Sequence, residues 1–229
     1  MPDYTCRDIA KLIDHSLLQP VLTDAELEAG CRLGREYEVA AVCIKPYAVC
    51  LAASILAGSG VAVCTVIGFP HGGHRTPVKV FESERAMDDG ATELDMVVNI
   101  GKVLFGDWGY VRADIAAVVE AAHRRKALVK VIFENCFLKD EHKIELCRIC
   151  GELRADFVKT STGYGGGGAT IEDLTLMRRY SPSHVQIKAA GGVRTFDQVL
   201  AVRQAGATRV GASATRAILD ECRTRLSRS

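Results

Sequence analysis

Long hydrophobic runs are missing from this chain of 229 residues, which excludes a protein that spans a membrane with helices. No apolar stretch reaches the roughly 18 residues that such a helix needs. The first segment carries Asp3, Arg7, Asp8 and Lys11 with no long apolar core behind them, so it does not resemble a signal peptide. We therefore expect a cytoplasmic protein with no membrane partner.

An excess of charge of one sign is also missing. Lys and Arg number 29 against 28 Asp and Glu, so the formal net charge is only +1. Such a chain has no global field that would attract nucleic acid or an anionic membrane, and we expect neither as a partner. An anionic substrate would have to be held by a local site. With 48% hydrophobic and 25% charged residues, the chain can form a packed core.

The sequence lacks a disulfide framework and a metal cluster. Its nine cysteines are scattered, and Cys43 and Cys64 lie inside apolar runs, as reduced core residues do. Cys147 and Cys150 form a CxxC in a segment of helical pattern with no second pair, which argues against a metal or redox role. The six histidines are dispersed. We expect no bound metal.

Short apolar runs of strand length alternate along the chain with longer segments of helical spacing. Many of these runs are nearly continuous Val, Ile and Ala, as expected for parallel strands that are covered on both faces. We predict eight strands, at 11–18, 39–44, 61–67, 93–98, 128–133, 157–161, 185–190 and 209–212.

Helix start signals fall between these runs. Thr23 with Glu26 and Thr195 with Gln198 have the spacing of capping boxes, and Thr170 precedes two acidic residues of a first turn. Eight βα units without an interruption predict an α/β fold, a single-domain (β/α)₈ TIM barrel over 1–229. A doubly wound open sheet is the alternative, although its usual GxGxxG turn after the first strand is missing.

Charged residues inside the predicted strands point to a functional site. Lys159, Lys188 and Asp95 each lie within an apolar run, and Lys130 and Glu134 share one parity, which predicts that they face the same side. A strand lysine can protect a sheet edge, but a closed barrel has no edges and its outer face packs against helices. We therefore expect these lysines to point into the barrel near its C-terminal mouth. A structural buried ion pair remains the alternative, and it explains one lysine more easily than three.

Two lysines and a carboxylate suit Schiff-base chemistry. An amine attacks a carbonyl only when it is unprotonated, and free lysine has a pKa of about 10.4. A second ammonium group and partial desolvation disfavour the charged form. Asp95 could then relay protons while the imine and the enamine form.

Glycine-rich turns after the late strands predict a phosphate site. Gly191 and Gly192 follow the seventh run and Ser213 follows the eighth, each just before a helix. Glycine lets backbone N–H groups approach an anion, and a helix N-terminus adds partial positive charge. Barrels commonly hold phosphate on these two loops. Arg194 could contact the phosphate or lie on the surface.

Segments along almost the whole chain resemble the 2-deoxyribose-5-phosphate aldolase family, a family of class I Schiff-base aldolases. The most specific of them is Phe-Val-Lys-Thr-Ser-Thr-Gly at 157–163, and similar segments cover 12–18, 63–70, 90–99 and 188–194. The resemblance implies a (β/α)₈ barrel that reversibly cleaves 2-deoxy-D-ribose 5-phosphate to acetaldehyde and D-glyceraldehyde 3-phosphate, in deoxyribose phosphate catabolism. It implies no metal or organic cofactor, and a homodimer.

The resemblance also implies residue roles. By position, Lys159 is the Schiff-base lysine, Lys188 the lysine that perturbs it, and Asp95 the proton relay. The substrate-binding positions implied are Asp14, Ser16, Cys43, Thr160, Gly163, Gly191, Gly192, Gly211 and Ser213.

Two positions depart from the family pattern. Some members end in a tyrosine that assists proton transfer, whereas this chain ends in Leu-Ser-Arg-Ser, and Ala190 replaces a serine that is common after the second lysine. Two other functions stay open on the residues. One is a Schiff-base lyase for another phosphosugar, against which the Asp14-His-Ser segment argues. The other is a non-catalytic phosphosugar-binding protein, which would not need both Lys159 and Asp95.

Overall fold

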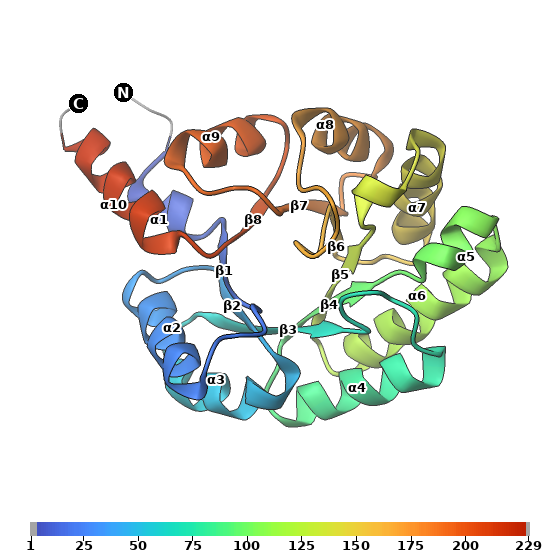
Figure 1. Ribbon diagram of the computed structural model, residues 1–229, viewed down its shortest axis with the longest axis horizontal. Coiled ribbons are helices and arrows are strands. Elements are labelled where there is room, and N and C mark those ends of the chain that lie inside the picture. The colour runs from blue at the N-terminus through green and yellow to red at the C-terminus, as the bar shows by residue number, and fades with distance from the viewer. Residues whose placement is uncertain (1–3, 228–229) are drawn as a thin grey trace.

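Eight parallel strands close into a barrel in the computed structural model, which describes residues 4–227 (Figure 1). The strands pair in sequence order from β1 to β8, and β8 pairs with β1. Helices surround the barrel, and α1 near the N-terminus lies beside α10 near the C-terminus. The predicted (β/α)₈ barrel is therefore confirmed, and the open-sheet alternative is wrong.

The strands and helices follow one another in regular alternation. The strands are β1 (Ile13–Leu17), β2 (Ala41–Ile44), β3 (Ala62–Ile67), β4 (Glu93–Val97), β5 (Leu128–Ile132), β6 (Phe157–Lys159), β7 (Gln186–Ala190) and β8 (Arg209–Ala212). The α-helices are α1 (Cys6–Ala10), α2 (Asp24–Glu36), α3 (Val49–Leu56), α4 (Thr76–Asp88), α5 (Ile100–Phe105), α6 (Trp108–Arg124), α7 (Asp140–Glu152), α8 (Ile171–Tyr180), α9 (Phe196–Gln204) and α10 (Thr215–Leu226), with 3₁₀ turns at η1 (Pro46–Ala48) and η2 (Asn135–Phe137).

Each predicted strand is present, but most are shorter at one or both ends. Lys11 is not in β1, because it caps the short helix α1 in a right-handed helical conformation. At the other end of the barrel β6 stops at Lys159, and Thr160 turns its hydroxyl to the backbone of Ala190. Apolar pattern marks the buried stretch, whereas the strand ends where pairing with the neighbouring strand stops.

The predicted helix starts are confirmed. Thr23 and Thr195 form capping boxes with Glu26 and Gln198, and the Thr170 side chain caps α8. The CxxC cysteines lie buried in α7. No helix within residues 4–227 is both long and apolar enough to cross a membrane. Arg228 and Ser229, the last residues of the tail that lacks a tyrosine, are outside the described residues.

Because side chains alternate along the strands, the molecule has one buried region outside the sheet and another inside the barrel. Side chains that point outward form the large apolar core between the sheet and the helices. The inward positions near β2 and β3 hold a small second apolar cluster around Ala41, Cys43, Cys64 and Val66. The inward positions of the other strands carry charges instead, which places the site inside the barrel.

Candidate active site

A cavity of about 320 Å³ opens at the carboxyl ends of the strands. Ten of the twelve site residues predicted from the sequence line it, including both lysines. The ten are Asp14, Ser16, Cys43, Lys159, Gly163, Lys188, Gly191, Gly192, Gly211 and Ser213. The fold thus brings together residues from β1, β2, β6, β7 and β8 and from the loops that follow them.

Asp95 lies directly beneath this cavity, fully buried, and both lysines contact it. Lys159 Nζ donates to Asp95 Oδ2 at 2.7 Å, and Lys188 Nζ donates to the same oxygen at 2.8 Å. Burial alone would raise the pKa of the Asp95 carboxyl, but Lys130 and the other two lysines hold its pKa well below the usual range. Asp95 is therefore a carboxylate at neutral pH, available as a proton acceptor.

Lys188 has a second carboxylate partner. Its ammonium group donates to Asp14 Oδ2 at 2.5 Å, so it joins Asp14 of β1 to Asp95 of β4 across the barrel. Burial lowers the pKa of the Lys188 ammonium, but the charges of Asp14 and Asp95 outweigh it, and the net pKa is raised. Lys188 therefore stays charged beside Lys159. The pKa of Asp14 falls to about 2, because Lys188, Lys130 and Arg209 overcome the effect of its burial.

A second charged layer lies below the first, and the sequence analysis did not assign two of its members. Glu93, two residues before Asp95, points inward by strand alternation, and Lys130 Nζ contacts it at 2.6 Å. Arg209 of β8 contacts both Glu93 oxygens, at 2.8 and 3.1 Å, and also contacts Asp14. Glu93 and Arg209 stand at the first positions of β4 and β8, and the register places both inside the barrel.

Glu134 lies beyond the end of β5, so the strand alternation that places Lys130 does not set its position. β5 ends at Ile132, and Glu134 has a left-handed backbone (φ 59°) that breaks the alternation. Its buried carboxylate instead accepts hydrogen bonds from the backbone N–H and the hydroxyl of Thr162. Glu134 thereby holds the start of the glycine-rich loop after β6.

The predicted phosphate loops lie together at one side of the cavity. Gly191 and Gly192 have positive φ angles of 84° and 88°, which favour glycine. A Cβ on Gly168 would approach the Gly191 carbonyl oxygen to 2.3 Å, so glycine is also needed where the loops after β6 and β7 touch. Arg194 lines the same cavity. Backbone N–H groups, an arginine and the nearby start of α9 suit an anion.

Thr160 is the substrate-position residue that the fold places elsewhere. It is fully buried, it does not line the cavity, and its hydroxyl both accepts from Ala190 N–H and donates to Ala190 O at 3.0 Å. Its side chain therefore fastens β6 to β7. Tyr164, which the sequence analysis passed over, lines the mouth, donates to the Leu18 carbonyl and packs edge-on against Phe69.

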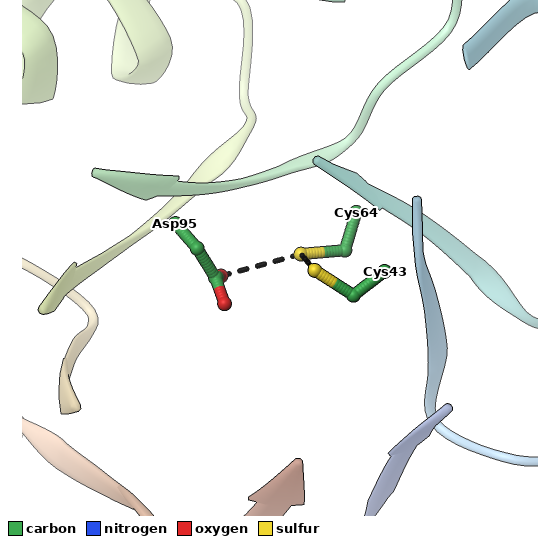
Figure 2. Close-up of side chains that lie close together, drawn as sticks. All are labelled: Cys43, Cys64 and Asp95. Atoms are coloured by element: carbon green, nitrogen blue, oxygen red, sulfur yellow. Dashed lines mark hydrogen bonds between the residues drawn. The ribbon is translucent and has the colours of Figure 1, made fainter. Parts of the chain in front are cut away.

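Cys43, Cys64 and Asp95 offer metal-ligand atoms within 4.8 Å of one another (Figure 2). Cys64 Sγ lies 3.2 Å from Asp95 Oδ1 and 3.5 Å from Cys43 Sγ. Lys130 Nζ, however, lies 3.3 Å from Cys64 Sγ and 2.8 Å from the same Asp95 oxygen. An ammonium group thus occupies the place where a cation would bind.

Comparison with known proteins agrees with this geometry. A protein-family model described as "DeoC/LacD family aldolase" matches residues 9–221. A deoxyribose-phosphate aldolase of Rhodopirellula baltica is 56% identical over 226 residues, covering 99% of this chain and 94% of the relative. One from Thermococcus gammatolerans is 49% identical, covering 94% of this chain and 97% of the relative.

Solved structures show the same fold. An aldolase called QR15 superposes with a TM-score of 0.91 at 36% identity, covering 96% of this chain and 98% of that one. A tetrameric deoxyribose phosphate aldolase from Aeropyrum pernix superposes with a TM-score of 0.89 at 28% identity, covering 96% and 93%. Fold and site therefore define an aldolase, an enzyme of the lyase class. The chain belongs to the DeoC/LacD aldolase family, as the sequence resemblance indicated.

Proposed function

We propose that this aldolase reversibly cleaves 2-deoxy-D-ribose 5-phosphate to acetaldehyde and D-glyceraldehyde 3-phosphate, with Lys159 as the Schiff-base lysine. The names of the similar enzymes supply the substrate class. The charge arrangement inside the barrel supplies the reason for choosing this lysine. The proposal includes a role in deoxyribose phosphate catabolism in the cytoplasm.

One observation supports the choice of Lys159 above the other buried cations. Within the described residues, Lys159 contacts a single carboxylate oxygen, and it shares that oxygen with Lys188. Lys188 also has Asp14, and Lys130 also has Glu93. Lys159 is therefore the ammonium group with the fewest carboxylate partners, and we assign it the role of the nucleophile. It also reaches the cavity, where a carbonyl would bind.

The neutral amine of Lys159 attacks the substrate carbonyl, and loss of water from the carbinolamine gives a protonated imine. That iminium withdraws electrons, so when the hydroxyl on the third carbon loses its proton, the bond between the second and third carbons breaks, which releases D-glyceraldehyde 3-phosphate and leaves an enamine. Protonation of the enamine at the second carbon and addition of water to the imine then release acetaldehyde and the free amine. Asp95, 2.7 Å from the amine, accepts and returns protons in these steps. Lys188 stays charged and opposes reprotonation of Lys159.

The end of β8 and the loops after β6, β7 and β8 would hold the phosphate, and β1 and β2 would hold the sugar hydroxyls. Gly163, Gly191, Gly192, Gly211 and Ser213 line the first part, with Arg194 beside them. Asp14, Ser16 and Cys43 line the second. A substrate that contacts both groups of residues would place its carbonyl near Lys159.

Three experiments test the proposal. Purified protein with 2-deoxy-D-ribose 5-phosphate should release glyceraldehyde 3-phosphate, measured by a coupled reduction that consumes NADH. A lyase for another phosphosugar would prefer a different substrate in this assay, and a non-catalytic binding protein would give no turnover.

We also propose a homodimer of single-domain chains spanning 1–229, for which light scattering should give twice the chain mass of 24.8 kDa. A single cooperative unfolding transition would support one domain.

A further inference from the structure

Arg209 lies under the reaction chamber and does not line the cavity. Its guanidinium contacts Glu93 through two nitrogens and contacts Asp14 through one of them, and its side chain is 14% exposed. The guanidinium carbon also lies 5.5 Å from the centroid of the Phe157 ring. Arg209 is thus close to the carboxylates of the site but apart from any substrate in the cavity.

The interior of the barrel holds four cations against three carboxylates. One positive charge is therefore in excess, and every carboxylate is shared by two or more cations. The charged and titratable groups that face one another from the eight strands are Asp14, Cys43, Cys64, Glu93, Asp95, Lys130, Lys159, Lys188 and Arg209.

Contacts in this layer are linked by competition. Glu93 is shared by Arg209 and Lys130, and Lys130 is shared by Glu93 and Asp95. Asp95 in turn is shared by Lys130 and Lys159. If Arg209 were neutral, Glu93 would attract Lys130 more strongly, and Asp95 would have more capacity left to hold the proton of Lys159.

We propose that Arg209 is a positioning residue which, together with Glu93, maintains the excess positive charge that makes Lys159 give up its proton. This inference rests on the proposed Schiff-base function. Arg209 acts on the amine through Glu93, Lys130 and Asp95, and it touches no reacting atom. Since this effect on Lys159 is electrostatic, its direction must depend on the sign of the charge that a substitution removes.

Opposite substitutions therefore have opposite effects. Arg209→Met removes the excess charge, so the acid limb of the kcat/KM profile should move up by about one pH unit, with a roughly tenfold lower value at pH 7. Glu93→Gln adds one more uncompensated cation, so the limb should move down by about one unit. The double variant restores the wild-type charge and replaces a buried pair with neutral groups, so its limb should return close to the wild-type position.

Two further variants separate charge from structure. Arg209→Lys keeps the charge but not the bidentate contact with Glu93, so its acid limb should lie near that of the wild type. Arg32→Met removes an arginine from an exposed ion pair with Glu28 and should leave the limb in place. A role in folding alone would lower activity and Tm in all the Arg209 and Glu93 variants without moving the limb.

The readout is the fraction of protein that acetaldehyde and cyanoborohydride modify across a pH series, measured by mass spectrometry beside kcat/KM. This trapping follows the neutral amine even in variants whose turnover is slow. Limb shifts of opposite sign with recovery in the double variant support the inference. Suppose that the wild type forms the adduct at Lys159, but the acid limbs of the Arg209 and Glu93 variants do not move or all move in the same direction. That result overturns the inference and leaves the proposed function standing. Absence of a wild-type adduct overturns both.

Discussion

The ammonium groups of Lys159 and Lys188 donate to one and the same oxygen, Oδ2 of Asp95, at 2.7 and 2.8 Å. The two cations come from neighbouring strands, where Lys159 pairs directly with Lys188 in the β6–β7 register. Two ammonium groups that share one oxygen repel each other, and each is stabilised less than it would be if it had that oxygen to itself. Lys159 has fewer other carboxylate partners than Lys188 among the described residues, which is why the proposed function makes it the nucleophile.

Lys188→Leu should shift the acid limb of the kcat/KM profile to higher pH. Removing the neighbouring charge leaves Lys159 better compensated by Asp95, so its amine stays protonated to a higher pH. Asp14 keeps Arg209 as a partner, so no buried carboxylate is left alone. Lys102→Leu, in a partly exposed pair with Asp107 outside the barrel, is the control and should not shift the limb. An unchanged profile in Lys188→Leu would count against electrostatic activation.

Lys159→Ala should lower kcat by roughly 10³-fold or more, because Lys188, the other lysine that lines the cavity, is held by Asp14 and Asp95. The fold should remain, since Asp95 keeps Lys130 and Lys188 as partners and the shortened side chain leaves its space open to the cavity. Steady-state assays at several pH values measure the first effect, and circular dichroism with thermal unfolding measures the second. Turnover near that of the wild type in a folded variant would refute the proposed nucleophile.

Lys79→Met should destabilise the fold by about 3–5 kcal/mol, because it leaves a buried carboxylate without its cation. Lys79 of α4 and Asp114 of α6 form a fully buried pair at 2.5 Å, and Lys79 also donates to the Val97 carbonyl at the end of β4. Urea unfolding measures the loss. The double variant Lys79→Met with Asp114→Leu should recover most of it. A single variant that costs under about 1 kcal/mol would contradict the cost expected for breaking this buried pair.

His15 should make the fold less stable as the pH falls. Burial lowers the pKa of this imidazole from 6.5 to about 4, and its Nδ1 lies 2.8 Å from the hydroxyl of Thr215. The folded protein then binds this proton less readily than the unfolded chain does. Its contribution is complete above pH 6.5 and is lost as the pH falls toward 4, at a cost of up to roughly 3 kcal/mol.

His15→Gln has no such titration, so its unfolding free energy should fall less than that of the wild type between pH 7 and pH 4.5. Urea unfolding at the two pH values provides the comparison. Equal losses in the two proteins would show that His15 is not held neutral by the fold.

Apolar runs were enough to predict the barrel, and glycine-rich turns predicted its phosphate loops, whereas Asp14, Ser16 and Cys43 of the cavity came from the family resemblance. In a closed sheet, a charged residue inside a run has only the interior left, so Lys159, Lys188 and Asp95 could be placed together before any distance was known. Glu93 and Arg209 stand at the starts of β4 and β8, where a charge is usually a solvated flank of a strand. Only the register shows that both lie inside.

Local backbone geometry explains the remaining differences. Glu134 leaves the alternation because its backbone is left-handed, and no residue type nearby marks that change. Thr160 faces away from the cavity because it directly follows Lys159, whose side chain points inward. The alternation therefore already argued against a substrate contact at Thr160, which only the family resemblance had implied.

The most direct test of the central claim is the location of a trapped imine. Wild-type protein treated with acetaldehyde and borohydride, digested and mapped by mass spectrometry, should carry a reduced two-carbon adduct on Lys159, while Lys130 and Lys188 stay unmodified. An adduct on Lys188, or active enzyme with no adduct at all, would contradict the account.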